Sequence, residues 1–147
     1  MIDFLIGEIE VTRIVDVEGP DFPPFEFFPD CTQKMLEPHL DWLQPRFLDP
    51  KNGKLIFAIQ SYLLHTKHHT ILIDSCIGED KERTRFPAWN LRADTDYIAK
   101  LAAAGVSPES VDYVLCTHLH ADHVGWNTRL VDGRWVPTFP NAQYVFA

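Results

Sequence analysis

Apolar residues along the chain gather in short runs that are typical of strands. Residues 55–64 and 70–73 are two such runs, and the polar segment 65–69 between them is short enough for a hairpin turn. We therefore expect these runs to pair as antiparallel strands. A third run over 111–117, with a continuous apolar stretch at 113–116, predicts a strand that is covered on both faces.

Further elements are predicted on either side of these runs. Imperfect alternation over residues 9–17 predicts a strand. Residues 97–102 place their apolar side chains on one helical face, so we expect a helix that begins at a cap at Asp94 or Thr95 and continues through Ala103.

The C-terminal residues predict a hairpin and a final strand. Asp132-Gly133 between apolar flanks signals the turn, and residues 134–138 and 142–147 are predicted as the last strands. Natural domains rarely end in an apolar strand, so we expect residues 1–147 to be one domain that is truncated at its C-terminus.

Residues 20–54 differ in composition from the rest of the chain. They hold seven of the eleven prolines together with many aromatic residues. Dense proline breaks regular structure apart from short helical turns, for instance around residues 33–42, while the aromatic content argues against disorder. The segment either lines a ligand site or forms an apolar clasp over the sheet or a contact in a homodimer, because exposed aromatic patches mark interfaces as readily as ligand sites.

Composition narrows the function classes. Apolar residues make up 46% of the chain and charged residues 23%, which is close to the average for folded domains. The net charge of −8 argues against nucleic-acid binding, which needs a basic surface. No apolar run approaches 18 residues, so we expect no membrane span.

The cysteines bear on the compartment. Cys31, Cys76 and Cys116 form no CxxC pair, and an odd number without a disulfide framework favours a reducing environment. The first residues show no basic-then-apolar secretory signal. We therefore expect a cytoplasmic protein in which all three cysteines are small core residues.

The most distinctive chemistry follows the 111–117 strand. Residues 118–123 read His-Leu-His-Ala-Asp-His, so four of six are metal-ligand types. In an extended backbone His118 and His120 share one face and can reach one ion, and a turn would bring Asp122 and His123 to a neighbouring position. These ligand types suit zinc, and also iron, manganese or cobalt. The alternative is a histidine-rich surface loop without metal.

A second histidine group lies in segment 65–69. Three of its five residues are histidine, at positions 65, 68 and 69. We interpret this segment as a solvated hairpin turn rather than a metal tract, because its spacing matches no defined ligand geometry.

Residues 117–125, Thr-His-Leu-His-Ala-Asp-His-Val-Gly, resemble the signature of the metallo-β-lactamase-fold hydrolases. The resemblance implies that His118 and His120 bind one metal ion and that Asp122 and His123 bind a second. It also implies an αβ/βα sandwich with a mixed sheet and flanking helices, of which this chain would be the N-terminal half. The three later ligands of that family have no counterpart, since no histidine follows His123. A second copy of the chain or a C-terminal half would have to supply them.

The resemblance extends to other segments. Residues 70–78 resemble the family's strand that ends in Asp-[Thr/Ser]-Gly, with Cys76 where glycine is more usual. This implies that Asp74 lies beneath the metal loop and hydrogen-bonds the groups that hold the metal; the alternative is an aspartate that only caps a turn. Residues 126–127 and 139–145 resemble the branch that includes lactonases and organophosphate hydrolases. In that branch the 20–54 insertion would wall the substrate pocket.

These observations predict a metal-dependent hydrolase. The resemblance implies two Zn²⁺ ions that activate a water for attack on a lactone, ester or organophosphate, with Asp122 both binding metal and orienting the nucleophile. Two alternatives remain. One is a metal-binding fragment without activity, and the other is an iron- and flavin-linked redox member of the superfamily, which often has glutamate where this chain has Ala121.

Overall fold

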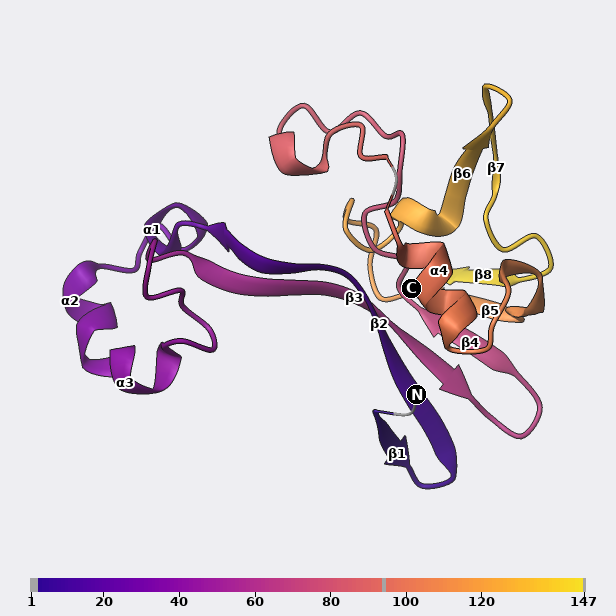
Figure 1. Cartoon of the computed structure of the whole chain (residues 1–147), viewed down its shortest axis with the longest axis horizontal. Coiled ribbons are helices and arrows are strands. Elements are labelled where there is room, and N and C mark those ends of the chain that lie inside the picture. The colour runs from indigo at the N-terminus through magenta and orange to yellow at the C-terminus, as the bar shows by residue number, and fades with distance from the viewer. Residues whose placement is uncertain (1–2, 94, 147) are drawn as a thin grey trace. The chain divides into compact units, whose positions relative to one another are not determined.

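The computed structural model describes residues 3–93 and 95–146. The chain divides into two compact units (Figure 1). The first combines the residues up to Asp16 with those from Ile59 onward, and the second is Val17–Ala58. All the predicted site residues belong to the first unit.

A six-stranded mixed sheet forms the framework, in the order β1-β2-β3-β4-β5-β8. Its strands are β1 (Phe4–Ile6), β2 (Ile9–Phe22), β3 (Leu55–His65), β4 (Thr70–Ile73), β5 (Tyr113–Cys116) and β8 (Gln143–Phe146). The β1–β2 and β3–β4 pairs are antiparallel, whereas β4–β5 and β5–β8 are parallel. The predicted hairpin is confirmed, and so is the predicted fold class of a mixed sheet with flanking helices.

The parallel β4–β5 pair requires a long crossover, which contains the helix α4 (Tyr97–Ala103). The predicted helix is confirmed, although its N-cap residue is Asp96. Of the two expected caps, Thr95 lies one residue too early and Asp94 lies outside the described residues. Gly105, at φ +83°, ends the helix in the left-handed conformation that glycine adopts without strain.

The crossover continues through a short 3₁₀ turn, η3 (Pro108–Ser110). The core of the first unit lies where α4 covers the sheet. Leu63, Leu72 and Val114, from three neighbouring strands, are fully buried in one cluster with Tyr97 and Leu101 of α4. Burying each such side chain contributes about 1.5–3 kcal/mol, so this cluster fixes the ends of β4 and β5 from which the candidate site is built.

A separate two-stranded sheet follows the candidate site. It consists of β6 (Thr128–Val131) and β7 (Arg134–Pro137), preceded by η4 (Gly125–Asn127). Asp132 and Gly133 both have positive φ, as a tight hairpin turn requires, and the predicted turn is confirmed.

The second unit carries the short helical turns expected between residues 33 and 42. Its helices are α1 (Pro24–Phe27), α2 (Gln33–Leu36), η1 (Glu37–His39) and α3 (Leu40–Leu43), and η2 (Pro87–Trp89) is a similar turn of the first unit. Phe22, Phe27 and Phe57 pack together with ring centroids 4.9–5.3 Å apart. Cys31 of this unit is only half-buried, so its predicted place in a core is wrong, because this small unit buries few side chains.

None of the helices in the described part of the chain has the length and apolar character needed to cross a bilayer.

Candidate metal centre

The loop that carries the candidate ligands begins earlier than expected. β5 ends at Cys116, because the Thr117 backbone N–H donates to the Asp74 carboxylate over 2.8 Å instead of continuing a strand ladder. The Thr117 hydroxyl donates to the same carboxylate over 2.8 Å. The chain therefore turns out of the sheet at Thr117, and the expected extended backbone at His118 and His120 is wrong.

Asp74 itself lies at the carboxyl end of β4. Its backbone N–H donates to the Leu115 carbonyl oxygen over 2.8 Å, and its φ of +57° turns the chain away from β4 at once. The residue is 8% exposed. Its carboxylate Oδ2 lies 2.7 Å from Nδ1 of His123, in addition to the two Thr117 contacts. Asp74 therefore holds both ends of the candidate ligand loop, at Thr117 and at His123.

The loop after Asp74 is also clamped to the end of the candidate ligand loop through backbone contacts. Ser75 N–H donates to the His123 carbonyl oxygen over 2.8 Å, and Gly125 N–H donates to the Cys76 carbonyl oxygen over 2.7 Å. The approach is so close that a Cβ on Gly125 would lie 1.8 Å from the Ile77 carbonyl oxygen. Only glycine fits at position 125.

The four candidate ligands lie in this one loop, and the structure brings them near one another. The His118 ring centroid is 4.5 Å from that of His120 and 3.9 Å from that of His123. Asp122 Oδ2 lies 3.4 Å from His123 Nε2. Across residues 3–93 and 95–146, however, no three His, Cys, Asp or Glu side chains are placed to hold one ion together. Their role as ligands stays a prediction.

The donor atoms of Asp122 and His123 nonetheless fit a metal ion. Two ligands bound to a tetrahedral zinc at about 2.0–2.2 Å lie about 3.4 Å from each other, which is the separation of Asp122 Oδ2 and His123 Nε2. Metal-binding histidines usually donate their second ring N–H to a carboxylate, and Asp74 is placed to accept it from Nδ1 of His123. The side chains of Asp74, His123 and Asp122 thus form the arrangement expected around one ligand of a metal.

Cys76 and Cys116 are buried in the core cluster of the first unit. Burial raises the pKa of the Cys76 thiol to about 12, and burial also raises the pKa of Cys116. Cys76 shares a buried contact with Ser61, whose hydroxyl lies 2.6 Å from that of Tyr97. Cys76 and Cys116 are core residues, as expected.

An ion pair beneath the clamp could not be predicted from sequence. Arg92 donates to both carboxylate oxygens of Asp16 over 2.9 Å, and Asp16 Oδ2 also accepts the Ile77 N–H over 3.1 Å. The Asp16 side chain is fully buried. Its partner lies 76 positions away in the chain, and no local pattern indicates such a pairing.

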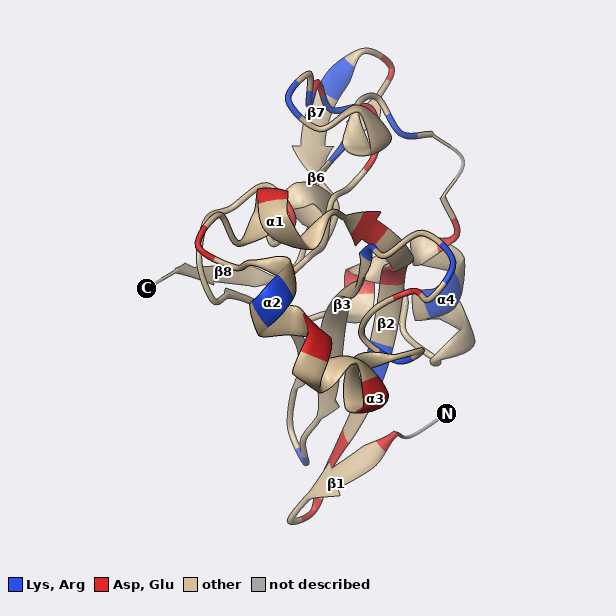
Figure 2. Ribbon diagram, turned by 90° about the vertical axis from the view of Figure 1, so that its left-hand side faces the viewer, with Lys and Arg blue, Asp and Glu red and all other residues tan. Residues whose placement is uncertain are grey.

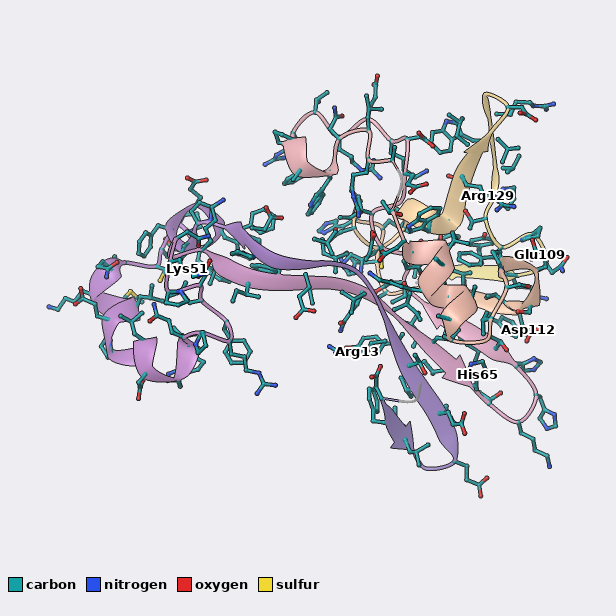
Figure 3. The ribbon with its side chains drawn as sticks, in the orientation of Figure 1. Arg13, Lys51, His65, Glu109, Asp112 and Arg129 are labelled. Atoms are coloured by element: carbon teal, nitrogen blue, oxygen red, sulfur yellow. The ribbon has the colours of Figure 1, made fainter. Side chains whose placement is uncertain are left out.

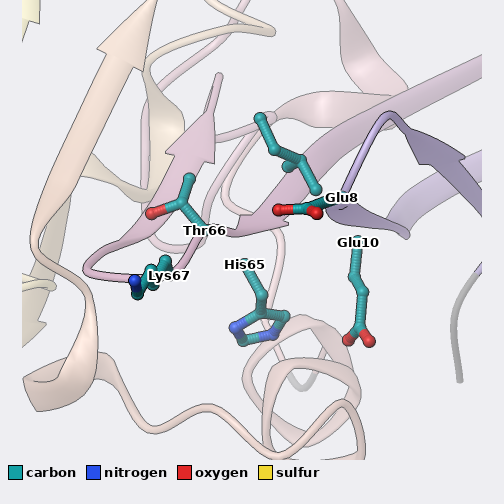
Figure 4. Close-up of a pocket in the computed structure, with 6 residues that line it drawn as sticks. Glu8, Glu10, His65, Thr66 and Lys67 are labelled. Carbon is teal, nitrogen blue, oxygen red and sulfur yellow. The ribbon is translucent and has the colours of Figure 1, made fainter.

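The second histidine group does not converge on a site. The β3–β4 turn leaves His68 and His69 exposed, and Thr66 caps it by accepting the N–H groups of both. A hollow beside the turn, lined by Glu8, Ile9, Glu10, His65, Thr66 and Lys67, receives only one of the three histidines (Figure 4). The prediction of a hairpin turn is confirmed.

Comparison with known proteins decides the family. Residues 56–147 match the sequence profile described as the Metallo-beta-lactamase superfamily. The chain belongs to the metallo-beta-lactamase superfamily. A search of curated proteins found no match.

Solved structures of this superfamily share the fold. A probable metal-dependent hydrolase from Staphylococcus aureus has a TM-score of 0.71 and 21% identity, covering 96% of this chain and 47% of its own. The hydrolase AbOPH of the beta lactamase superfamily has a TM-score of 0.68 and 29% identity, covering 96% and 42%. AidC, a dizinc quorum-quenching lactonase, has a TM-score of 0.69 and 21% identity, with the same coverage. The chain thus spans less than half the length of each of these structures.

Proposed function

We propose that the protein is a metal-dependent hydrolase that acts on a lactone, an ester or an organophosphate. Membership of the superfamily and the similarity to a hydrolase at 29% identity support this proposal. The observation that carries it is the fit of Asp122 and His123 to a shared ion, with Asp74 placed behind His123.

Each candidate ligand has a role in the proposal. His118 and His120 would hold one ion, and Asp122 and His123 a second, with Zn²⁺ as the first choice and Mn²⁺, Fe²⁺ or Co²⁺ as alternatives. Such ions, when bound, lower the pKa of a coordinated water towards neutrality and polarise a carbonyl or phosphoryl oxygen. Asp122 would also accept a hydrogen bond from the attacking water and so orient it.

Asp74 would act through its neighbours rather than on the substrate. Asp74 Oδ2 lies 2.7 Å from Nδ1 of His123, and by accepting a proton from that nitrogen it would fix the tautomer that leaves Nε2 free for the metal. By accepting two hydrogen bonds from Thr117 it fixes the point at which the loop leaves β5. Both contacts keep the ligands in place before any metal arrives.

A small neutral or weakly charged substrate suits the chain better than a nucleic acid. The net charge of −8 repels polyanions, and AidC, which shares the fold, is described as a lactonase with the product N-hexanoyl-L-homoserine bound. We also propose a cytoplasmic location, which the absence of a disulfide among Cys31, Cys76 and Cys116 supports.

Residues 1–147 supply four of the ligands that two ions require. We propose that a matching C-terminal half or a second copy of the chain completes the site. Hydrolysis of a lactone, an aryl ester and an organophosphate should therefore be near background for residues 1–147 with added Zn²⁺, Mn²⁺ or Co²⁺. Activity should appear when a C-terminal half is added.

Two variants control this experiment. His118→Ala should abolish the restored activity, and His68→Ala, in the β3–β4 turn, should leave it unchanged. Turnover by residues 1–147 alone that clearly exceeds the His118→Ala background would show that the chain needs no further ligands from a C-terminal half or a second copy. Metal binding without turnover in any combination would instead favour a non-catalytic metal-binding protein.

A further inference from the structure

Arg83 lies in a loop that is fastened to the start of β6, the strand that follows the candidate metal centre. Lys81 Nζ donates to both the carbonyl and the hydroxyl oxygen of Thr128 over 3.0 Å. The Arg83 backbone N–H donates to Asn90 Oδ1 over 2.7 Å, and Leu91 N–H donates to the Lys81 carbonyl oxygen over 2.8 Å. These contacts close the loop on itself and fix the backbone from which the Arg83 side chain extends.

The guanidinium of Arg83 reaches the candidate ligand loop and is poorly satisfied there. Its Nη2 lies 3.5 Å from the carbonyl oxygen of Ala121, which stands between two candidate ligands. This distance is at the outer limit of a hydrogen bond. The Nε–H is shielded from solvent and has no acceptor among the described residues. An unsatisfied donor of this kind gains from an acceptor brought by a ligand.

Arg92, in the same loop, has a structural role and provides a comparison for Arg83. Both of its terminal nitrogens donate to Asp16 over 2.9 Å, so its charge is neutralised in a planar pair. Arg83 forms no ion pair with a carboxylate in the described part of the chain. Its charge therefore remains available beside residues 118–123.

Arg83 lies among charges of both signs, since residues 79–85 hold three acidic and three basic side chains. Burial, and then the charge of Arg83, lower the pKa of Lys81 to about 8, which places the two cations within electrostatic reach of each other. Figure 2 shows both basic and acidic segments on and next to the β6–β7 hairpin, which follows the candidate metal centre. The unpaired guanidinium of Arg83, with Lys81 near it, is the group that an anion would meet at this position.

We propose that Arg83 binds the oxyanion of the acid that hydrolysis releases. Hydrolysis of an ester or lactone consumes one water and yields a carboxylate, an alcohol and a proton, whereas an organophosphate triester yields a phosphate diester anion. Both products present two oxygens that a guanidinium can bind in a planar pair. The identity of the ligand rests on the proposed function, but oxyanion binding itself does not.

The test is an NMR titration of metal-free, isotope-labelled chain with butyrate, diethyl phosphate and, as an uncharged control, 1-butanol. The Arg83 Nε–H and Ala121 amide signals should shift and saturate with at least one anion and not with the alcohol. Saturation by butyrate alone would assign a carboxylate product, and saturation by diethyl phosphate alone a phosphate diester. Equal shifts with the alcohol would overturn the proposal.

Matched variants decide whether Arg83 is responsible. Arg83→Gln should weaken anion binding by at least about tenfold, the loss expected for a charged hydrogen-bonded pair, with an otherwise unchanged amide spectrum. Arg83→Lys, which keeps the charge but loses the planar fork, should fall in between. Arg85→Gln, two residues away and exposed, should bind as the unmodified chain does. Unchanged affinity in Arg83→Gln, or an equal loss in Arg85→Gln, would contradict the assignment.

One further variant separates this inference from the proposed function. His118→Ala should leave anion binding by the metal-free chain intact while abolishing hydrolysis in the completed enzyme. In the unmodified completed enzyme, anion binding without hydrolysis would leave Arg83 as an oxyanion site and reject the hydrolase. Hydrolysis without anion binding at Arg83 would support the hydrolase and reject Arg83 as an oxyanion site.

Discussion

Two segments of the chain hold three histidines each, and only one of them is built like a site. In the 118–123 loop, His123 contacts the Asp74 carboxylate at 2.7 Å, and their side chains are 28% and 12% exposed. In the 65–69 turn, His69 lies 3.9 Å from the Asp112 carboxylate, and both side chains are about half exposed. A carboxylate in water holds a histidine weakly, whereas a buried one fixes its position. Burial of the partner, not histidine content, distinguishes the two segments.

The direction of the strands explains this difference. Asp74 and the 118–123 loop follow the carboxyl ends of the parallel strands β4 and β5, the end of a parallel sheet at which functional groups usually gather. Asp112 precedes β5, and together with His65 it lies at the opposite end, near the β3–β4 turn (Figure 3). The two histidine segments therefore sit at opposite ends of the same strands.

The largest effect should come from filling the space at Gly125. In Gly125→Ala the new Cβ would meet the Ile77 carbonyl oxygen at 1.8 Å, so the clamp on the candidate ligand loop must open. We expect the free energy of unfolding in urea to fall by more than about 3 kcal/mol. Gly133→Ala is the control, because nothing lies within 4 Å of its new Cβ and only the positive φ costs about 1 kcal/mol. Similar losses of stability in both variants would show that the close contact of Gly125 with Ile77 is not what stabilises the chain there.

Removing the buried carboxylate of Asp74 should leave the histidines of the 118–123 loop as weakly held as those of the 65–69 turn. Asp74→Asn takes a charged acceptor from Thr117 and His123, so we expect a loss of about 1.5–3 kcal/mol in stability. Zn²⁺ affinity should fall about 10–100-fold, as is typical when the carboxylate behind a metal-binding histidine is lost. Asp112→Asn should change Zn²⁺ affinity less than about twofold, since it leaves the candidate ligands untouched. Calorimetric titration measures the Zn²⁺ affinity of both variants; an equal loss of affinity in the two would show that burial of the carboxylate does not distinguish the two histidine segments.

A smaller effect concerns Lys81, which fastens β6 on the side of the candidate metal centre. Burial and the charge of Arg83 lower its pKa from 10.5 to about 8. Between these values the unfolded chain binds more protons than the folded one, so this lysine makes stability rise with pH from about 8 to 10.5. Lys81→Met should remove that rise, which we expect to be about 1 kcal/mol after allowance for solvent screening.

The control for this titration is Lys67→Met in the exposed β3–β4 turn. Urea unfolding at pH 7.5 and pH 10 gives the slope for each variant. A rise that persists in Lys81→Met would place its origin in another group.

The local parts of this structure were predictable from sequence. The β3–β4 hairpin, α4 and the turn at Asp132-Gly133 each follow from a periodicity or a turn signal within a few residues. The motif also located the candidate ligands and the aspartate beneath them. What sequence could not supply was the way distant segments meet. The Asp16–Arg92 pair and the contact of Gly125 with Ile77 join positions 76 and 48 residues apart.

The end of β5 shows the same limit at a single residue. The apolar pattern continues a strand to Thr117, but the Asp74 side chain competes for the Thr117 N–H and ends the strand at Cys116. Such competition is invisible in a local pattern, because the acceptor comes from another strand. It places His118 and His120 in the loop and sets the positions of all four candidate ligands.

The central claim is that the 118–123 loop, and not the 65–69 turn, binds metal. Its most direct test is Zn²⁺ titration by calorimetry of two double variants, His118→Ala/His120→Ala and His65→Ala/His68→Ala. We predict that the first loses Zn²⁺ binding and the second retains the affinity and stoichiometry of the unmodified chain. Zn²⁺ binding that survives in the first and disappears in the second would contradict the account.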